Sequence, residues 1–209
     1  MNHTNQHGRS MIEMLGVLAI IGVLSVGGIA GYSKAMMKFK INKTIDQISQ
    51  ISQNVRVLYA RQKSYRNLST KIAYKANLAP REIFEGSGSD YGMTNAFGGA
   101  IGLYGTNLEN RTHDYKAFSL GIDGLPEEAC IELATQDWGG INSGLVGIAV
   151  DVSSASWGNV YKNCQGQVLS NGAAACSGGG TVPIPMPVDI AVDACVCNSY
   201  GCSINFKFY

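Results

Sequence analysis

The feature that most constrains how this chain folds is an uncharged segment near its amino terminus. Residues 14–33 hold no Asp, Glu, Lys or Arg, and Glu13 and Lys34 stand directly before and after them. As an α-helix that rises about 1.5 Å per residue, the segment spans about 30 Å, the thickness of the hydrocarbon core of a bilayer. It therefore predicts a helix that lies in a membrane or packs among other apolar helices.

Three ordinary kinds of segment share this composition. A signal anchor has such a run, and so does a secretory signal peptide, for which Gly28-Ile29-Ala30 offers a small-x-small cleavage site. A buried core helix fits least, because the run is long and terminal. A signal peptide usually carries basic residues before its apolar run, so Glu13 at the start of this run argues against that interpretation.

Beyond Lys34 the apolar residues narrow to one helical stripe. They recur at steps of three and four between residues 41 and 59, with polar residues between them, which is the pattern of a helix that packs one face against a core. No proline occurs in residues 9–79, so we expect a single helix over residues 9–63. The expected stripe consists of Ile41, Ile45, Ile48, Ile51, Val55, Leu58 and Tyr59.

The remaining residues, 64–209, are enough for one globular domain with its own core and too few for two. Pro126, the two acidic residues that follow it and Gly139-Gly140 predict a helix over 123–138. We expect strands at 115–122, 144–152 and 203–209, a long loop with short elements at 66–110, a loop or hairpin at 158–180, and an extended edge or connector at 181–189. A long helix followed by strands around one further helix predicts an α+β fold.

All six cysteines lie in the second half of the chain, where they favour disulfide bonds in an oxidising compartment. A metal site is not expected, because the C-x2-C pairs of zinc ribbons are missing and none of the three histidines lies near the cysteines in sequence. Short loops close most easily, which favours the pairs Cys164–Cys176 and Cys197–Cys202 and leaves Cys130–Cys195 as a long link.

No arrangement of residues predicts catalysis, a metal or a cofactor. His113-Asp114 is an isolated pair in a polar segment, and the glycine-rich residues 97–105 lack the lysine and Ser/Thr of a phosphate loop. The formal charge of +1 gives no electrostatic basis for binding nucleic acid. We interpret the basic cluster of Arg56, Arg61, Lys63 and Arg66 as a solvated face or a contact between subunits.

The amino-terminal residues resemble those of type IV prepilins and of the pseudopilins of type II secretion. Gly8 is followed five residues later by Glu13, then by the run MLGVLAIIGVL (14–24) and later by Tyr32. The likeness covers residues 8–33 and rests on the combination of the glycine, the glutamate at that offset and the long uncharged helix. Two positions depart from the usual pattern: Arg9 stands where the family has Phe or Met, and Ala30 where many members have a proline that kinks the helix.

This resemblance implies a leader at residues 1–8, a long helix at 9–63 and a pilin head at 64–209 with an antiparallel sheet and a disulfide-bounded carboxy-terminal region. A prepilin peptidase on the cytoplasmic face would cut between Gly8 and Arg9, and the new terminus would be methylated. The chain would wait in the inner membrane and would then be polymerised by the assembly machinery, with other pilin subunits, into a filament around residues 14–33. The large head and extra cysteines favour the type IVb pilins.

The resemblance also gives Glu13 a physical role. A carboxylate in hydrocarbon is costly unless it is paired. Cleavage after Gly8 would create a cationic amine at Arg9, and in the assembly of the family Glu13 would neutralise that amine on an adjoining subunit.

Other functions remain open in the sequence. A pseudopilin in a periplasmic piston or a minor pilin would share these motifs with the subunit of an extracellular pilus, and a secreted binding domain would need only a removed signal peptide. The sequence also gives conflicting indications of which side of the membrane the head lies on. Lys34, Lys38, Lys40 and Lys43 outnumber Arg9 and favour a cytoplasmic head, whereas the cysteines favour an oxidising compartment. We give the cysteines more weight.

Overall fold

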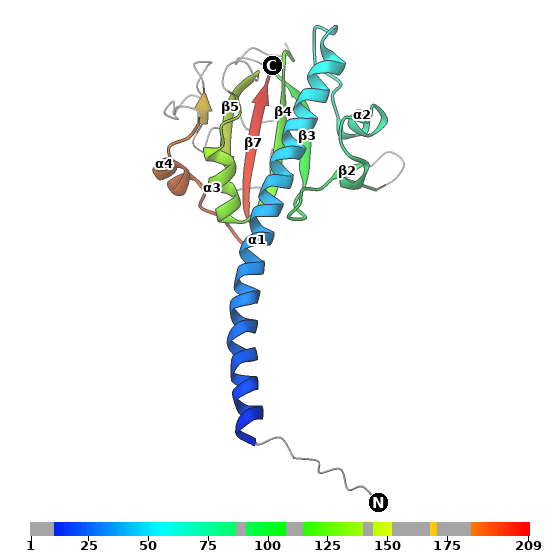
Figure 1. The fold of residues 1–209 in the computed structure, drawn as a ribbon. Helices are drawn as coiled ribbons and strands as arrows, with labels where there is room; N and C mark the ends of the chain where they lie inside the picture. Colours follow the sequence, from blue (N-terminus) through cyan, green and yellow to red (C-terminus); the bar gives the residue numbers. More distant parts are fainter. Residues whose placement is uncertain (1–10, 87–90, 108–114, 140–143, 152–167, 171–184) are drawn as a thin grey trace, which may run out of the picture. The chain divides into compact units, whose positions relative to one another are not determined.

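The computed structural model describes residues 11–86, 91–107, 115–139, 144–151, 168–170 and 185–209 (Figure 1). The chain divides into two compact units, Met1–Phe39 and Lys40–Tyr209. One long helix, α1 (Met11–Tyr59, 49 residues), runs through both units. Its residues 11–39 are the described part of the first unit, and its residues 40–59 begin the second. The second unit is called the head from here on.

Helix α1 ends four residues before the expected end at residue 63. The chain turns after Tyr59, where the amide of Gln62 donates to the carbonyl of Tyr59 (2.8 Å). The amide of Tyr65 then donates to the carbonyl of Tyr115 (2.8 Å), so that tertiary contacts with the head replace the last helical turn. The expected start at residue 9 lies outside the described residues.

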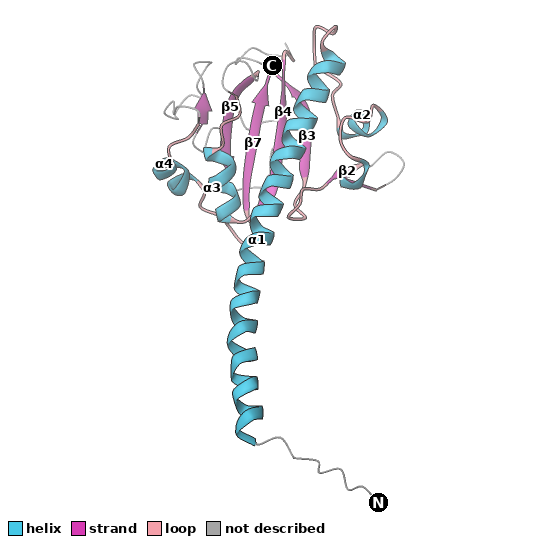
Figure 2. Ribbon diagram, viewed as in Figure 1, coloured by secondary structure: helices cyan, strands magenta, loops and turns pink. Residues whose placement is uncertain are grey.

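The head is built on an antiparallel sheet of five strands in the order β3-β4-β7-β5-β6 (Figure 2). Strand β7 is central and pairs with β4 through Leu120↔Phe206 and with β5 through Ile148↔Phe206. The strands are β3 (Ile101–Thr106), β4 (Ala117–Leu125), β5 (Leu145–Asp151), β6 (Val168–Ser170) and β7 (Cys202–Phe208). This arrangement is the α+β fold expected from the sequence.

The core lies between one face of this sheet and the head part of α1. Ile41, Ile48, Ile51 and Val55 of α1 are fully buried. A row of rings joins the two layers, with centroid distances of 5.1 Å for Tyr59–Tyr65, 5.1 Å for Tyr65–Phe118 and 5.3 Å for Phe118–Phe208. Trp138 packs edge-on against Phe206, at 4.8 Å between centroids, and its indole N–H donates to the carbonyl of Leu133 (3.1 Å).

Short elements complete the head. The segment expected to be a long loop at 66–110 contains α2 (Thr70–Lys75), a 3-10 turn (Arg81–Ile83), the two-stranded sheet of β1 (Phe84–Glu85) and β2 (Gly92–Met93), and the full strand β3. Helix α3 (Glu127–Thr135) follows β4, and α4 (Val188–Ala194) precedes β7.

Several expected elements have different bounds in the structure. Residues 123–125 belong to β4 and not to the helix, because Leu125 pairs with Cys202 and Pro126 then starts α3. Helix α3 ends at Thr135, before Gly139. The connector expected at 181–189 is non-helical at residues 185–187 but becomes α4 at Val188, directly after Pro187. Of the loop or hairpin at 158–180, only β6 lies within the described residues.

Candidate functional site

The apolar half of α1 is the most unusual surface of the chain. Residues 11–35 are all exposed, although a soluble helix normally buries its apolar face. By length and composition, α1 is the one helix among the described residues that could cross a membrane, a property that signal sequences share. The exposed apolar residues are Met11, Ile12, Met14, Leu15, Val17, Leu18, Ile20, Ile21, Val23, Leu24, Val26, Ile29, Tyr32 and Phe39.

Five glycines interrupt this apolar surface. A Cβ atom placed at Gly16, Gly22, Gly27, Gly28 or Gly31 would meet nothing within 4 Å. No contact within the chain therefore requires glycine there, although glycine weakens a helix by about 1 kcal/mol relative to alanine. Small residues of this kind allow the backbone of a second helix to approach closely in an apolar medium.

Glu13 lies in the first turn of α1 and is exposed to solvent. A carboxylate in this position interacts favourably with the partial positive charge of the helix amino terminus. Gly8 and Arg9, the predicted cleavage site, fall outside the described residues, so the roles of all three residues stay predictions.

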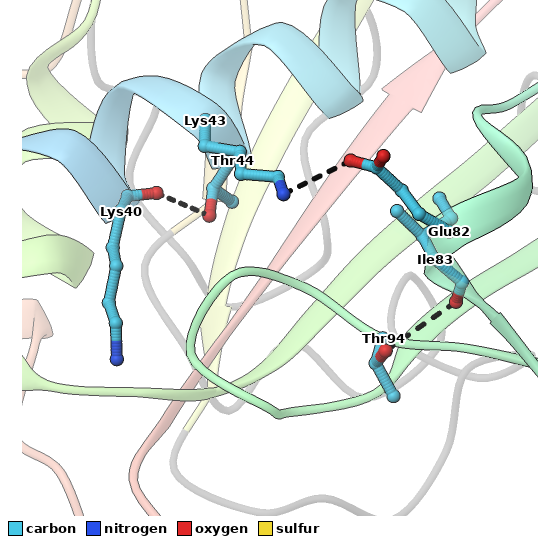
Figure 3. A network of polar contacts seen from close by, with 6 residues as sticks. All are labelled: Lys40, Lys43, Thr44, Glu82, Ile83 and Thr94. Atoms are coloured by element: carbon cyan, nitrogen blue, oxygen red, sulfur yellow. Dashed lines mark hydrogen bonds and ion pairs between the residues drawn. The ribbon is translucent and has the colours of Figure 1, made fainter.

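Polar contacts fix the chain between α2 and β2 to the head part of α1 (Figure 3). Lys43 Nζ lies 3.1 Å from Glu82 Oε1, and the Asn54 side-chain amide donates to the carbonyl of Leu78 (2.9 Å). The Thr94 hydroxyl donates to the carbonyl of Ile83 (3.5 Å), which links the residue after β2 to the end of the 3-10 turn.

Two disulfides tie the carboxy-terminal half of the head together. Cys130 in α3 is bonded to Cys195 at the end of α4, and Cys197 is bonded to Cys202 at the start of β7. These are two of the three pairs favoured by the sequence. The third pair, Cys164–Cys176, lies outside the described residues. None of the described cysteines is free.

In the basic cluster at the end of α1, Arg56 and Arg66 lie against other parts of the head, whereas Arg61 and Lys63 extend into solvent. The guanidinium of Arg66 lies 5.1 Å from the centre of the Tyr115 ring, and that of Arg56 lies so close to Gly144 that a side chain there would clash with it. Arg61 and Lys63 are exposed. Burial raises the pKa of Tyr65, an effect that the positive charge of Arg56 partly offsets.

The described residues contain no group of three or more His, Cys, Asp or Glu that could hold a metal ion. The pair His113-Asp114 lies outside them. The glycine-rich residues 97–105 contribute most of strand β3, which the sequence did not reveal. Gly105 is needed in that strand because a Cβ atom there would overlap the backbone carbonyl of Tyr65.

The head also has a small surface hollow of about 190 Å³, which the sequence did not predict. Its polar lining residues are Asp123, Asn198, Tyr200 and Ser203. Asp123 and Ser203 are 80 residues apart in the chain, so only strand pairing brings them together. The local signal was the run CNSYGC, whose asparagine, glycine and flanking cysteines are typical of a closed turn.

Comparison with known proteins decides the family. The protein family described as "PilS N terminal" matches residues 29–186, which is most of the chain. The chain belongs to this family and is a type IV pilin-like protein.

Two curated relatives agree with that assignment, and one solved pilin structure shares the fold. The pilin-like chain is 28% identical over 160 residues to the major structural subunit of bundle-forming pilus from Escherichia coli O111:H-, a match that covers 76% of this chain and 80% of the relative. The same subunit from Escherichia coli O127:H6 (strain E2348/69 / EPEC) gives the same identity and coverage. TcpA, a type IV pilin from Vibrio cholerae El Tor biotype, shares the fold with a TM-score of 0.55 at 14% identity, over 81% of this chain and 99% of TcpA. A type IV b pilin from Salmonella typhi aligns with a TM-score of 0.48 at 14% identity, over 81% of this chain and 97% of that pilin.

Proposed function

We propose that this chain is a structural subunit of a type IV pilus, polymerised through the apolar half of α1. The observation that carries the proposal is the exposed apolar surface of residues 11–33 on a chain with the type IV pilin fold. Exposure of a large apolar side chain to water costs about 1.5–3 kcal/mol relative to its full burial. The surface therefore requires an apolar environment. A bilayer provides that environment before assembly, and the equivalent helices of other subunits provide it afterwards.

Processing by a prepilin peptidase, between Gly8 and Arg9, would prepare the chain for assembly. It would remove the leader at residues 1–8 and place a cationic amine four residues before Glu13. The glycines of the apolar half would let neighbouring helices approach closely. The disulfide-bonded head would then lie outside the cytoplasm, first at the inner membrane with the assembly machinery and later in the extracellular filament. The head is not expected to be an enzyme, since the relatives are structural subunits.

Sequencing the amino terminus of the mature protein tests the processing step. A mature chain that starts at Arg9 supports the proposal. A start near Gly31 would identify a removed signal peptide and a secreted head, and would overturn it.

Glu13→Gln tests assembly while keeping the shape of the side chain. Removing one partner of a buried ion pair costs about 3–5 kcal/mol, so the yield of surface filaments should fall by about a hundredfold or more. Glu82→Gln is the matched control, because Glu82 is an exposed carboxylate of the head and its change should leave the yield unaltered. Electron microscopy and the pilin content of sheared fractions give both yields. Normal filaments from Glu13→Gln would contradict the role of Glu13, and filaments confined to the periplasm would indicate a pseudopilus.

A further inference from the structure

The residues of α1 that follow the uncharged run combine lysines with aromatic rings. Tyr32 is 67% exposed and Phe39 is 59% exposed, and Lys34 and Lys38 between them are exposed as well. Two rings and two ammonium groups are therefore exposed within about two turns of one helix. Aromatic rings and lysines gather where the hydrocarbon of a bilayer meets its headgroups. These four residues are called the collar from here on.

The collar has the depth of the headgroup layer when residues 14–33 span the hydrocarbon core. Lys34 directly follows that uncharged run. From Lys34 to Lys38 the helix rises about 6 Å, and the headgroup layer on one side of a bilayer is roughly 5–8 Å thick. Both ammonium groups can thus reach the level of the lipid phosphates.

The next two lysines of α1 are already held by the head. Lys43 Nζ lies 3.1 Å from Glu82 Oε1 (Figure 3). Lys40 Nζ lies 5.7 Å from the centre of the Phe97 ring. These contacts assign Lys40 and Lys43 to the stability of the head and leave the collar as the part of the basic segment that belongs to the first unit.

The sequence around Lys34 supplies no carboxylate. Residues 14–45 contain four lysines and no Asp or Glu. The residues one helical turn from Lys34 are Ala30, Gly31, Met37 and Lys38. Like charges four residues apart destabilise a helix, so an anion from outside the chain would relieve this repulsion. Its attraction would be strongest beside an apolar layer, where water screens charges less.

We propose that the collar binds the phosphate groups of anionic phospholipids in the membrane leaflet on the side of the head. The ammonium groups of Lys34 and Lys38 donate hydrogen bonds to phosphate oxygens. The Tyr32 and Phe39 rings pack against the glycerol and the upper acyl chains. This inference rests on the membrane stage of the proposed function and adds a class of lipid to it.

The charge of the headgroup determines which phospholipid fits. Headgroups that end in choline or ethanolamine carry an ammonium group of their own, which balances their phosphate. A headgroup that ends in neutral glycerol leaves the phosphate charge unbalanced, so two further ammonium groups are attracted to it. Anionic lipids in this leaflet would also offset the cost of placing the lysines on the side that the positive-inside rule disfavours.

The collar should strengthen the attachment of a subunit to an anionic membrane. Each lysine close to an anionic lipid surface increases binding about fivefold, so the two lysines together give about thirtyfold. A subunit that enters the filament exchanges these headgroups for other subunits. The lipid charge of the membrane should therefore influence how readily stored subunits are withdrawn from it.

Native mass spectrometry of the full chain tests the proposal in uncharged detergent micelles. The micelles contain equal amounts of phosphatidylglycerol and phosphatidylcholine with the same acyl chains. The unchanged chain should retain phosphatidylglycerol with a preference of about thirtyfold, and high salt should reduce that preference. Lys34→Gln with Lys38→Gln should retain the two lipids almost equally, whereas Lys34→Arg with Lys38→Arg should keep the preference because the charge remains.

Lys71→Gln with Lys75→Gln is the matched control. These two lysines are also exposed and four residues apart, but they lie on α2 of the head, so their change should not alter the preference. Equal retention of both lipids by the unchanged chain would overturn the proposal, and so would an equal loss of preference in the α2 variant. Displacement of the bound lipid by an equal concentration of soluble glycerol phosphate would also overturn it, because the site would then not need a membrane lipid.

This inference and the proposed function fail separately. A chain that forms filaments and starts at Arg9, but shows no lipid preference, would remove the collar and leave the pilus subunit. A chain that prefers phosphatidylglycerol but forms no filaments would retain the collar and overturn the assembly role.

Discussion

At the scale of single residues, Tyr59 and Tyr65 show how the end of α1 is joined to the sheet. The ring of Tyr59 packs at a tilt against that of Tyr65, which in turn packs at a tilt against Phe118. Burial raises the pKa of both phenols above the ordinary value of 10.0. A group whose pKa is raised by folding stabilises the folded state below its unfolded pKa and loses that contribution as the pH rises through the folded pKa. The head should therefore lose stability above about pH 10.

Thermal unfolding of the full chain between pH 8 and 11 measures this effect. Above pH 10, the midpoint temperature of unfolding should fall more steeply with pH for the unchanged chain than for Tyr59→Phe. Phenylalanine keeps the ring and removes the ionising group. Tyr209→Phe is a suitable control, since Tyr209 is half exposed. Equal slopes for all three proteins would contradict the prediction.

The sequence predicted most buried residues of α1 but not all of them. The stripe correctly included Ile41, Ile48, Ile51, Val55 and Tyr59, whereas Leu58 is 40% exposed. Thr44, Gln47 and Ser52 are buried although they are polar. The hydroxyls of Thr44 and Ser52 donate to carbonyls of their own helix, at Lys40 (2.9 Å) and Ser49 (3.0 Å), so burial leaves these donors satisfied, which an apolar periodicity does not reveal.

At the scale of elements, the two described disulfides should differ in their contribution to stability. Cys130–Cys195 spans 65 residues, and Cys197–Cys202 spans 5. Loop-closure entropy in the unfolded chain gives about 4 kcal/mol for the first and about 2 kcal/mol for the second. Replacing each pair with serine and measuring unfolding in denaturant tests this order. If removal of Cys197–Cys202 lowered the free energy of unfolding more than removal of Cys130–Cys195, strain or native contacts would outweigh the loop-closure entropy.

The segment after α2 should be held by apolar burial more than by its ion pair. Ile83 is 3% exposed, whereas the side chains of Lys43 and Glu82 are 41% and 65% exposed. Ile83→Ala should lower the free energy of unfolding by about 2–5 kcal/mol, and Glu82→Gln by less than about 1 kcal/mol. Denaturant unfolding of both variants at low and high salt checks this. A salt-sensitive loss of several kcal/mol for Glu82→Gln would refute it.

Elements with strong local patterns were predictable from the sequence, and elements defined by partners were not. The long helix, β4, β5, β7 and the helix after Pro126 follow from periodicity, alternation and capping. Strand β3 has two glycines in six residues, at Gly102 and Gly105, and resembles a loop until β4 pairs with it. The hollow beside Tyr200 has the same origin, because strand pairing brings Asp123 and Ser203 together.

At the scale of the whole molecule, the two signs of charge are separated along the sequence. Residues 1–116 hold 14 Lys and Arg against 7 Asp and Glu, while residues 117–209 hold 2 against 8. Within the head, α2 carries the exposed Lys71 and Lys75, and α4 carries the exposed Asp189 and Asp193. Figure 1 shows these helices beyond opposite edges of the sheet, α2 on the side of β3 and α4 on the side of β5. A subunit with opposite charges on opposite sides favours head-to-tail contacts, which generate open arrays.

This separation predicts that contacts between heads in the proposed filament are sensitive to charge. Reversing both acids, as Asp189→Lys with Asp193→Lys, should weaken each contact by about 1 kcal/mol, roughly fivefold in association. Adding Lys71→Glu and Lys75→Glu should restore it. Filament yield and its decline with salt provide the measurement, and Asp46→Lys, an exposed acid on α1, is the control. Failure of the second pair to restore assembly would exclude pairing between these two helices.

The position of β7 in the sheet also has a consequence for the timing of folding. The strand that separates β4 from β5 comes after every other strand in the sequence, so the halves β3–β4 and β5–β6 stay apart until it arrives. A chain that emerges from its amino-terminal end therefore cannot close its core early. The head should remain open, and competent to pass through a translocation channel, until its last strand has been delivered.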